Sequence, residues 1–238
     1  MRKLLADYLQ KSSYEREEDR LTGPVVTISR ECGCSARRIA AKLSKILTGY
    51  SYVSETKTEV KWRWASREII ETAAAELKVS PEFIDIVMRK EESERMAQLC
   101  RSFSEANAYN IRDERIVETI SRVIRSFAES GHYIIVGRGG MIFTEGIPDS
   151  LNIRLQAPLD WRINRIMQMS NLSHLEAEEF VKQVDRRREL FIEKVAGHKY
   201  DSANFDLVIN YSTLPDDHIV NAIVSIMRDR EMICVTEK

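Results

Sequence analysis

Short apolar segments alternate with amphipathic segments along most of the chain, and this alternation constrains the fold more than any other feature. The apolar segments have the length and β-branched composition of buried strands, and they lie at 25–29 (VVTIS), 50–53 (YSYV), 132–137 (HYIIVG), 151–155 (LNIRL) and 205–210 (FDLVIN). Apolar residues recur at helical spacing over 35–47, 66–77, 80–88, 116–127, 158–167, 173–195 and 216–230. Strands that alternate with helices predict an α/β protein, with a parallel sheet covered by helices on both faces.

The element boundaries follow from local signals. Thr48-Gly49 is expected to end the first helix, so that the segment 50–53 forms a second strand. The stretch 54–110 is polar and helix-rich and carries no buried-strand signal. Residues 1–20 are predicted to form a helical extension, and residues 21–238 one domain.

The composition is that of an ordinary globular protein and excludes several classes of function. Of the 238 residues, 43% are hydrophobic and 31% are charged, and the net charge is -1. This balance gives no support to binding of a nucleic acid polymer or a membrane surface. Apolar runs are shorter than the roughly 18 residues that span a bilayer, and the N-terminus lacks the apolar core of a signal peptide. The four cysteines make no disulfide framework at this length, so a cytoplasmic protein is predicted.

Right-handed crossovers place the carboxyl ends of parallel strands at one edge of the sheet, where ligands bind. The turn from Arg30 to Arg37 lies at this edge and joins the first strand to a helix. Its backbone N–H groups and the helix N-terminus together predict an anion site. Arg37 and Arg38 in the first helical turn are unfavourably placed unless an anion is bound. The alternative is a surface turn whose arginines are solvated.

The strand end VGRGG (136–140) brings a second arginine to the same edge. The guanidinium of Arg138 lies beside flexible backbone, and arginine suits phosphate through bidentate hydrogen bonds. A glycine-rich turn with an exposed arginine is the alternative.

A third set of arginines lies in the last third of the chain. Arg162 and Arg165 of DWRINRI share a helix face, and QVDRRRELF adds Asp185 and the arginines 186–188. Phosphoryl transfer needs positive charge around the transferring group, and a mobile helix can supply it on closure. The alternative for each of them is a solvated helix face with ion pairs such as Asp185 to Arg188.

Other conspicuous side chains point to packing. Cys32 and Cys34 lack a second Cys/His pair at zinc spacing, so we expect them to fill a tight loop; a thiol of lowered pKa at a helix N-terminus is the alternative. Trp62 and Trp64 are expected to pack in the core. None of the four histidines lies beside a nucleophile in sequence, which gives no support to a hydrolase triad.

Six segments in this order resemble the cytidylate kinase-like family, a branch of the nucleoside monophosphate kinases within the P-loop group. They are VVTISRECGCSARRIAAKL, SREIIETAAAEL, YIIVGRGGMIF, LNIRLQAPLDWRINRI, EAEEFVKQVDRRRELFIEKVAG and FDLVINYSTL. The resemblance covers about residues 24–227 and is weakest around 88–112. It implies a three-layer P-loop kinase fold with a five-stranded parallel sheet, a helical insert for the monophosphate near 54–111 and an arginine-rich lid near 169–201. It also implies transfer of the γ-phosphoryl group of ATP to a nucleoside monophosphate, CMP or dCMP, with Mg²⁺.

The phosphate loop departs from the broader group, whose loop reads G-x-x-x-x-G-K-[ST]. Aligned here, Arg30 takes the first glycine, Ser35 the last glycine, Ala36 the lysine and Arg37 the hydroxyl residue. A missing lysine removes positive charge from the phosphates, and Arg37 is the candidate to replace it. Ser35 is the candidate to replace the missing magnesium-binding hydroxyl.

The closer branch commonly resembles S-R-x-x-G-S-G-G-R. Its pattern is matched at Ser29, Arg30, Gly33 and Arg37, whereas a serine and two glycines are replaced at Cys34, Ser35 and Ala36. Side chains in place of glycines could crowd backbone that must approach phosphate. Ser66 stands where the branch usually has an acidic residue before the insert helix.

The resemblance thus implies two sets of site residues and no metal ligand. Nucleotide binding is assigned to Arg30, Gly33, Cys34, Ser35, Ala36, Arg37 and Arg38. Catalysis is assigned to Arg37, Arg138, Arg162, Arg186 and Arg188. Two functions stay open: an active nucleoside monophosphate kinase, or a catalytically impaired relative that binds nucleotide or phosphate. The 1–20 helix and the 88–112 region are candidates for partner or self association, including a homodimer.

Overall fold

A single parallel sheet of five strands forms the centre of the protein. The computed structural model describes residues 23–53, 60–88 and 113–233. The strands are β1 (Val25–Arg30), β2 (Arg63–Ala65), β3 (Tyr133–Val136), β4 (Ser150–Gln156) and β5 (Leu207–Asn210). They pair in the order β2-β3-β1-β4-β5, with every described pairing parallel. The predicted α/β class is therefore confirmed, and the N-terminal helix predicted at 1–20 lies outside the described residues.

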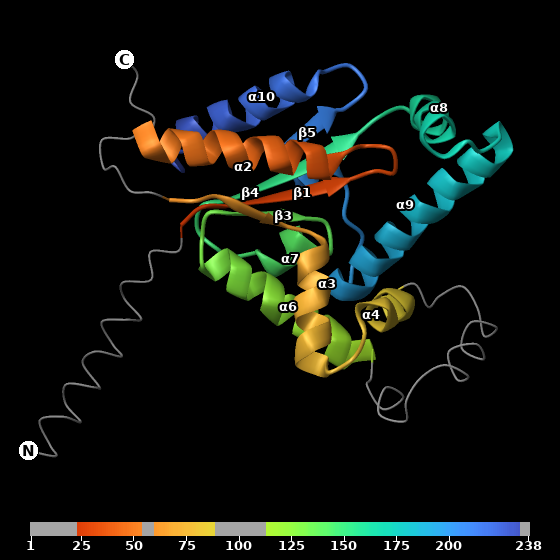
Figure 1. The fold of residues 1–238 in the computed structure, drawn as a ribbon, viewed down its shortest axis with the longest axis horizontal. Coiled ribbons are helices and arrows are strands. Elements are labelled where there is room, and N and C mark those ends of the chain that lie inside the picture. The colour runs from red at the N-terminus through yellow and green to blue at the C-terminus, as the bar shows by residue number, and fades with distance from the viewer. Residues whose placement is uncertain (1–22, 54–59, 89–112, 234–238) are drawn as a thin grey trace, which may run out of the picture.

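Helices cover both faces of this sheet (Figure 1). One face carries α2 (Ala36–Val53) and α10 (Asp216–Asp229), and the other carries α3 (Arg67–Leu77), α6 (Asp113–Glu129) and the short α7 (Gly140–Phe143). The remaining helices are α4 (Pro81–Met88), α8 (Leu159–Ser170), α9 (His174–Ala196) and the 3-10 turn η2 (Ser202–Asn204). None of the described helices is long and apolar enough to cross a membrane.

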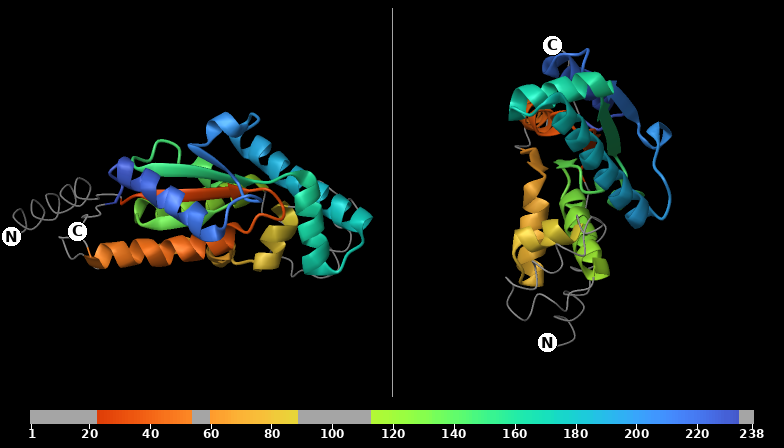
Figure 2. Two further views of the ribbon diagram at one scale, coloured as in Figure 1. Left: turned by 90° about the horizontal axis from the view of Figure 1, so that it is seen from above. Right: turned by 90° about the vertical axis from the view of Figure 1, so that its right-hand side faces the viewer.

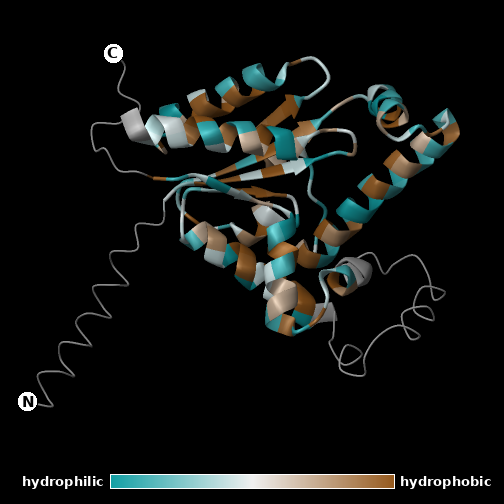
Figure 3. Ribbon diagram, viewed as in Figure 1, coloured by the Kyte–Doolittle hydropathy of each residue, from teal (hydrophilic) through white to brown (hydrophobic). Residues whose placement is uncertain are grey.

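Strand alternation divides the core into two apolar clusters. Val26 and Ile28 of β1 pack with α2 and α10, whereas Val25 packs with α3 and α6, and all three are fully buried. In Figure 3 the central strands are mostly hydrophobic, while the helices alternate between hydrophilic and hydrophobic residues along their length. The burial on both faces explains why the strands read as nearly continuous apolar runs.

Strand β4 is the exception to this two-sided burial. Leu151, Ile153 and Leu155 are fully buried against α2 and α10. The alternate positions are polar, and Asn152 accepts a 2.6 Å hydrogen bond from the hydroxyl of Thr27 while Arg154 lies one pleat further along. The face of the sheet away from α2 therefore ends in polar groups at β4.

Helices α8 and α9 extend beyond the carboxyl ends of the strands (Figures 1 and 2). A capping box at Ser173 and Glu176 begins α9. The two helices share a small apolar cluster made by Ile163, Ile166, Ala177 and Val181, and Cys32 from the turn after β1 packs into it. This turn is thus attached to the α8–α9 pair through the core.

Two predicted boundaries are wrong, and both errors lie between the first helix and α3. Residues 50–53, predicted as a strand, continue α2 to Val53. The strand beside β3 is β2, at Arg63–Ala65, inside the stretch in which no strand was predicted. β2 is an edge strand of three residues, too short to show a periodic pattern. Trp62 just before it is buried and its backbone N–H donates to the Thr48 hydroxyl at 3.0 Å, and Trp64 packs on the same core, as predicted for both tryptophans.

Replacing Gly49 by alanine is predicted to stabilise the protein. Gly49 lies inside α2 with open space around an added Cβ, so alanine relieves the entropic cost of a helical glycine, about 0.5–1 kcal/mol. Thermal unfolding followed by circular dichroism is expected to show a midpoint about 1–4 °C higher. A lower midpoint would mean that the helix ends at Gly49, as the sequence suggested.

Candidate functional site

A cavity of about 610 Å³ lies where the carboxyl ends of β1, β3 and β4 meet α9. Its wall combines apolar side chains of α9, such as Phe180 and Phe191, with many charged groups. The cationic ones are Arg30, Arg138, Arg154, Arg162, Lys182, Arg186, Arg187 and Arg188, and the acidic ones are Glu31, Asp185 and Glu189. The excess of cations makes the cavity suited to an anionic ligand.

Arg30, the last residue of β1, lies among several other cations of this cavity. Its guanidinium lies directly against Gly137, where a Cβ would come within 1.8 Å of Nη1. Burial, and then the nearby Arg188, Arg138 and Arg37, lower the pKa of Arg30 to about 9, so the group still carries its charge at pH 7. Among the described residues no carboxylate or other acceptor pairs with this guanidinium. A half-buried cation among like charges and without a counter-ion favours binding of an anion from outside the chain.

Arg138 is held beside it by an unusual turn. Gly137, Arg138 and Gly139 all have positive φ, of 73°, 58° and 72°. Glycine adopts this region freely, but a long side chain does so at a cost of about 1 kcal/mol. Arg188 approaches from α9, and its Nη1 donates to the carbonyl oxygen of Arg30 at 3.0 Å. Burial also lowers the pKa of Arg188. The end of β1, the turn after β3 and helix α9 thus each bring one positively charged arginine to the same part of the cavity.

The turn 31–35 is closed by its own backbone and packed into the core. The N–H of Cys34 donates to the carbonyl of Glu31 at 3.2 Å, and that of Ala36 to the carbonyl of Cys34 at 3.0 Å. Cys34 and Ala36 are 7% and 2% exposed and belong to the main apolar cluster. Burial raises the pKa of the Cys34 thiol to about 12. It also raises the pKa of Cys32, so the alternative of a thiol with lowered pKa is wrong.

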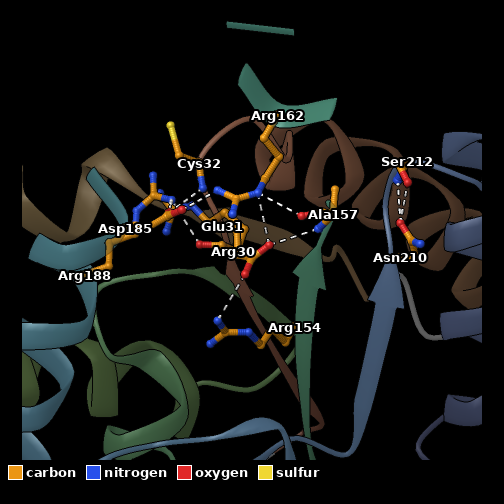
Figure 4. Close-up of polar contacts among 10 residues, drawn as sticks. All are labelled: Arg30, Glu31, Cys32, Arg154, Ala157, Arg162, Asp185, Arg188, Asn210 and Ser212. Atoms are coloured by element: carbon orange, nitrogen blue, oxygen red, sulfur yellow. Dashed lines mark hydrogen bonds and ion pairs between the residues drawn. The ribbon is translucent and has the colours of Figure 1, made fainter. Parts of the chain in front are cut away.

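Arg162 is fixed by a network that Figure 4 shows. Its Nε donates to the carbonyl of Ala157 at 2.9 Å and lies 3.4 Å from Oε2 of Glu31, while its Nη1 pairs with Asp185. The same Glu31 oxygen accepts from the N–H of Ala157 at 3.0 Å. The other Asp185 oxygen accepts from the N–H of Cys32 at 2.7 Å. Arg162 is 8% exposed, and these contacts join the turn after β1 to the end of β4, α8 and α9.

Arg165, on the same helix, turns to other partners. Its Nη2 donates to the Ser35 hydroxyl at 3.1 Å, and its guanidinium carbon lies 5.0 Å and 5.2 Å from the ring centroids of Trp161 and Tyr211. The shared helix face predicted for Arg162 and Arg165 therefore brings both arginines to the turn, at different points.

The predicted site residues fall into two groups in space. The cavity brings together Arg30, Arg138, Arg162, Arg186 and Arg188. The cavity wall does not include Gly33, Cys34, Ser35, Ala36, Arg37 or Arg38.

Two of the latter arginines have partners elsewhere. Arg38 pairs with Asp216 of α10 at 2.6 Å, and the Nε of Arg37 lies 3.4 Å from the Ser66 hydroxyl. The structure adds Glu31 and Arg154, which the sequence reading did not select. Arg154 could have been found from the polar–apolar alternation of LNIRL, which places it on the face opposite the apolar residues.

The described residues do not form a protein site for Mg²⁺. They hold no group of three or more His, Cys, Asp or Glu side chains that could bind a metal. The Ser35 hydroxyl already accepts from Arg165, and Glu31 and Asp185 are each bound by Arg162. These donor sets do not fit a resident magnesium ion.

Comparison with known proteins gives a family and a fold. The sequence model of the cytidylate kinase-like family matches residues 25–213. No curated protein matches the sequence.

Among solved structures, an uncharacterized protein from Eubacterium ventriosum ATCC 27560 is 19% identical with a TM-score of 0.59, over 87% of this chain and 98% of that one. Shikimate kinase from Bacteroides thetaiotaomicron is 10% identical with a TM-score of 0.46, over 88% of this chain and 99% of that one. At such identity, the likeness to the Eubacterium protein shows the fold alone.

The positive φ of Arg138 predicts an unequal response to two substitutions. Arg138→Gly and Arg138→Ala remove the same charge, but only glycine adopts φ of 58° without strain. In urea unfolding, Arg138→Gly is expected to be more stable than Arg138→Ala by about 1 kcal/mol. Equal stability of the two variants would show that the turn relaxes to another conformation.

Proposed function

The chain belongs to the cytidylate kinase-like family, and from this premise we propose that it binds a nucleotide in the arginine-rich cavity and transfers a phosphoryl group from ATP to a nucleoside monophosphate. CMP or dCMP is the proposed acceptor, by resemblance to the family. The segment 54–111 is proposed to hold the monophosphate and the segment 169–201, which contains α9, to act as the lid.

The observation that carries the proposal is the state of Arg30. A guanidinium whose pKa burial and three neighbouring arginines lower to about 9 is destabilising in the absence of an anion. A phosphate group bound there supplies the missing negative charge and accepts hydrogen bonds from several arginines at once. The unfavourable placement of these cations is explained if their task is to bind phosphate.

The proposed chemistry follows from where the charges lie. Arg30 and Arg138 come from strand ends that the sheet holds fixed. Arg188 comes from α9, so its positive charge moves with that helix. Phosphoryl transfer relies on positioning and on charge around the transferring group, more than on covalent chemistry of the protein. In this proposal Arg30 and Arg138 orient the phosphate, and Arg188, which already reaches Arg30 from α9, adds the third charge. Mg²⁺ would arrive with the phosphates of ATP and keep most of its water ligands.

One observation favours a second candidate, a phosphate-binding protein without catalysis. The residue aligned with the catalytic lysine of the broader group, Ala36, is 2% exposed and packed in the core. Arg165 reaches the neighbouring residue of this turn, Ser35, with a hydrogen bond of 3.1 Å. If Arg165 does not replace the lysine, binding survives and transfer does not.

Replacing Arg30 by glutamine is predicted to raise the stability of the free protein and to abolish phosphate binding. Without ligand the variant is expected to melt higher than the wild type, because a half-buried cation is removed from a cluster of like charges. Phosphate, CMP and ATP are expected to raise the melting temperature of the wild type, since a ligand at a hundred times Kd adds about 2.7 kcal/mol to the free energy of unfolding. They are expected to leave the melting temperature of Arg30→Gln unchanged. Arg125→Gln, an exposed position on α6 outside the cavity, is the control. A wild type that no nucleotide shifts at millimolar concentration would overturn the phosphate site.

An assay of ADP release across the nucleoside monophosphates distinguishes the two candidates. With ATP and Mg²⁺ the kinase is expected to turn over CMP or dCMP, and Arg138→Ala to lower kcat/KM by about 10²–10³-fold because a charge next to the transferring group is lost. Arg125→Ala is expected to match the wild type. Nucleotide binding without any turnover would favour the non-catalytic candidate, and full activity of Arg138→Ala would place the site elsewhere.

A further inference from the structure

The carboxylate of Asp185 occupies a position that a phosphate would take. One of its oxygens accepts from the backbone N–H of Cys32 at 2.7 Å, and the other pairs with Nη1 of Arg162. Nη1 of Arg188 lies 3.6 Å from the first oxygen. Figure 4 shows Asp185 between these three donors, with Arg30 beside them. A backbone N–H at a strand-to-helix turn and two guanidinium groups are the donors that bind phosphate oxygens in proteins.

Asp185 comes from α9, and Cys32 from the turn after β1, 153 positions earlier in the chain. The contact therefore tethers the proposed lid to the proposed phosphate turn. The side chain of Cys32 strengthens this link, since it packs with Ile163, Ile166 and Val181 in the cluster between α8 and α9. The same residue thus contacts α9 through its backbone and through its thiol.

We propose that Asp185 is an internal competitor for the phosphate site: it closes the site in the free protein, and a ligand phosphate must displace it to reach the N–H of Cys32 and Arg162. The inference rests on the proposed function for the identity of the ligand. It adds that ligand binding breaks the tether between α9 and the turn, so that phosphate binding and the position of α9 are coupled. Arg162 remains held by Glu31 and the carbonyl of Ala157 while its partner changes from Asp185 to phosphate.

The affinity for phosphate tests this competition. Isothermal titration with inorganic phosphate and with pyrophosphate, without metal, is expected to show binding about tenfold tighter or more for Asp185→Asn and Asp185→Ala than for the wild type, because the ligand no longer displaces a charge-assisted pair. Glu179→Gln is the matched control: Glu179 lies on the same helix, is exposed and is not part of the cavity wall. It removes the same charge, and it is expected to change the affinity less than about threefold.

A measurement on the wild type keeps the test independent of how well the variants fold. The backbone amide resonance of Cys32 is expected to shift when pyrophosphate saturates the protein, because its hydrogen-bond acceptor changes. Equal or weaker binding by Asp185→Asn than by the wild type, or a Cys32 resonance that stays in place while pyrophosphate binds, would overturn the competition and leave the proposed function standing. If neither the wild type nor the variants bind phosphate or pyrophosphate, the proposed function fails together with the inference.

Discussion

The placement of the half-buried Arg30 guanidinium next to other guanidinium groups is the constraint around which the site is arranged. It brings the guanidinium against Gly137, whose φ of 73° favours glycine. It also requires a scaffold stable enough to hold like charges together, and the doubly covered parallel sheet provides this through residues such as Val26 and Ile28 that are fully buried. The strained φ of Arg138 depends on the same scaffold.

Two carboxylates neutralise part of the positive charge of this cavity. Glu31 and Asp185 both bind Arg162, and each also accepts from a backbone N–H, of Ala157 and Cys32 respectively. Arg162 is thereby neutralised and serves to connect four parts of the chain, whereas Arg30 lacks such a partner among the described residues. The two arginines thus have different physical roles: Arg162 holds parts of the chain together in this state, and Arg30 is available to bind a ligand.

The sequence predicts the sheet well where strands are long and buried on both faces, as at β1 and β3. It fails at β2, since three edge residues carry no period, and at 50–53, where aromatic β-formers continue a helix because Leu47 and Tyr50 pack on the main core.

Strand ends were enough to select Arg30 and Arg138. The ion pair of Asp185 with Arg188 was foreseen, but its bond with the N–H of Cys32 was not predictable, because a hydrogen bond between residues 153 positions apart depends on how α9 is placed on the turn. The arginines at 37 and 38 look equivalent in sequence, yet they are directed toward Ser66 and toward α10.

The burial of Ala36 also limits which side chains this position can hold. A lysine introduced there in one step would have to bring its ammonium group out of a position that is 2% exposed and enclosed by the main core. Burying a charge without a partner is costly enough to unfold a marginally stable domain. A lysine at this position is therefore incompatible with the present packing unless the residues around Cys34 and Ala36 are repacked. Positive charge near this turn has to come from arginines on other elements, such as Arg165, which reaches the turn through Ser35.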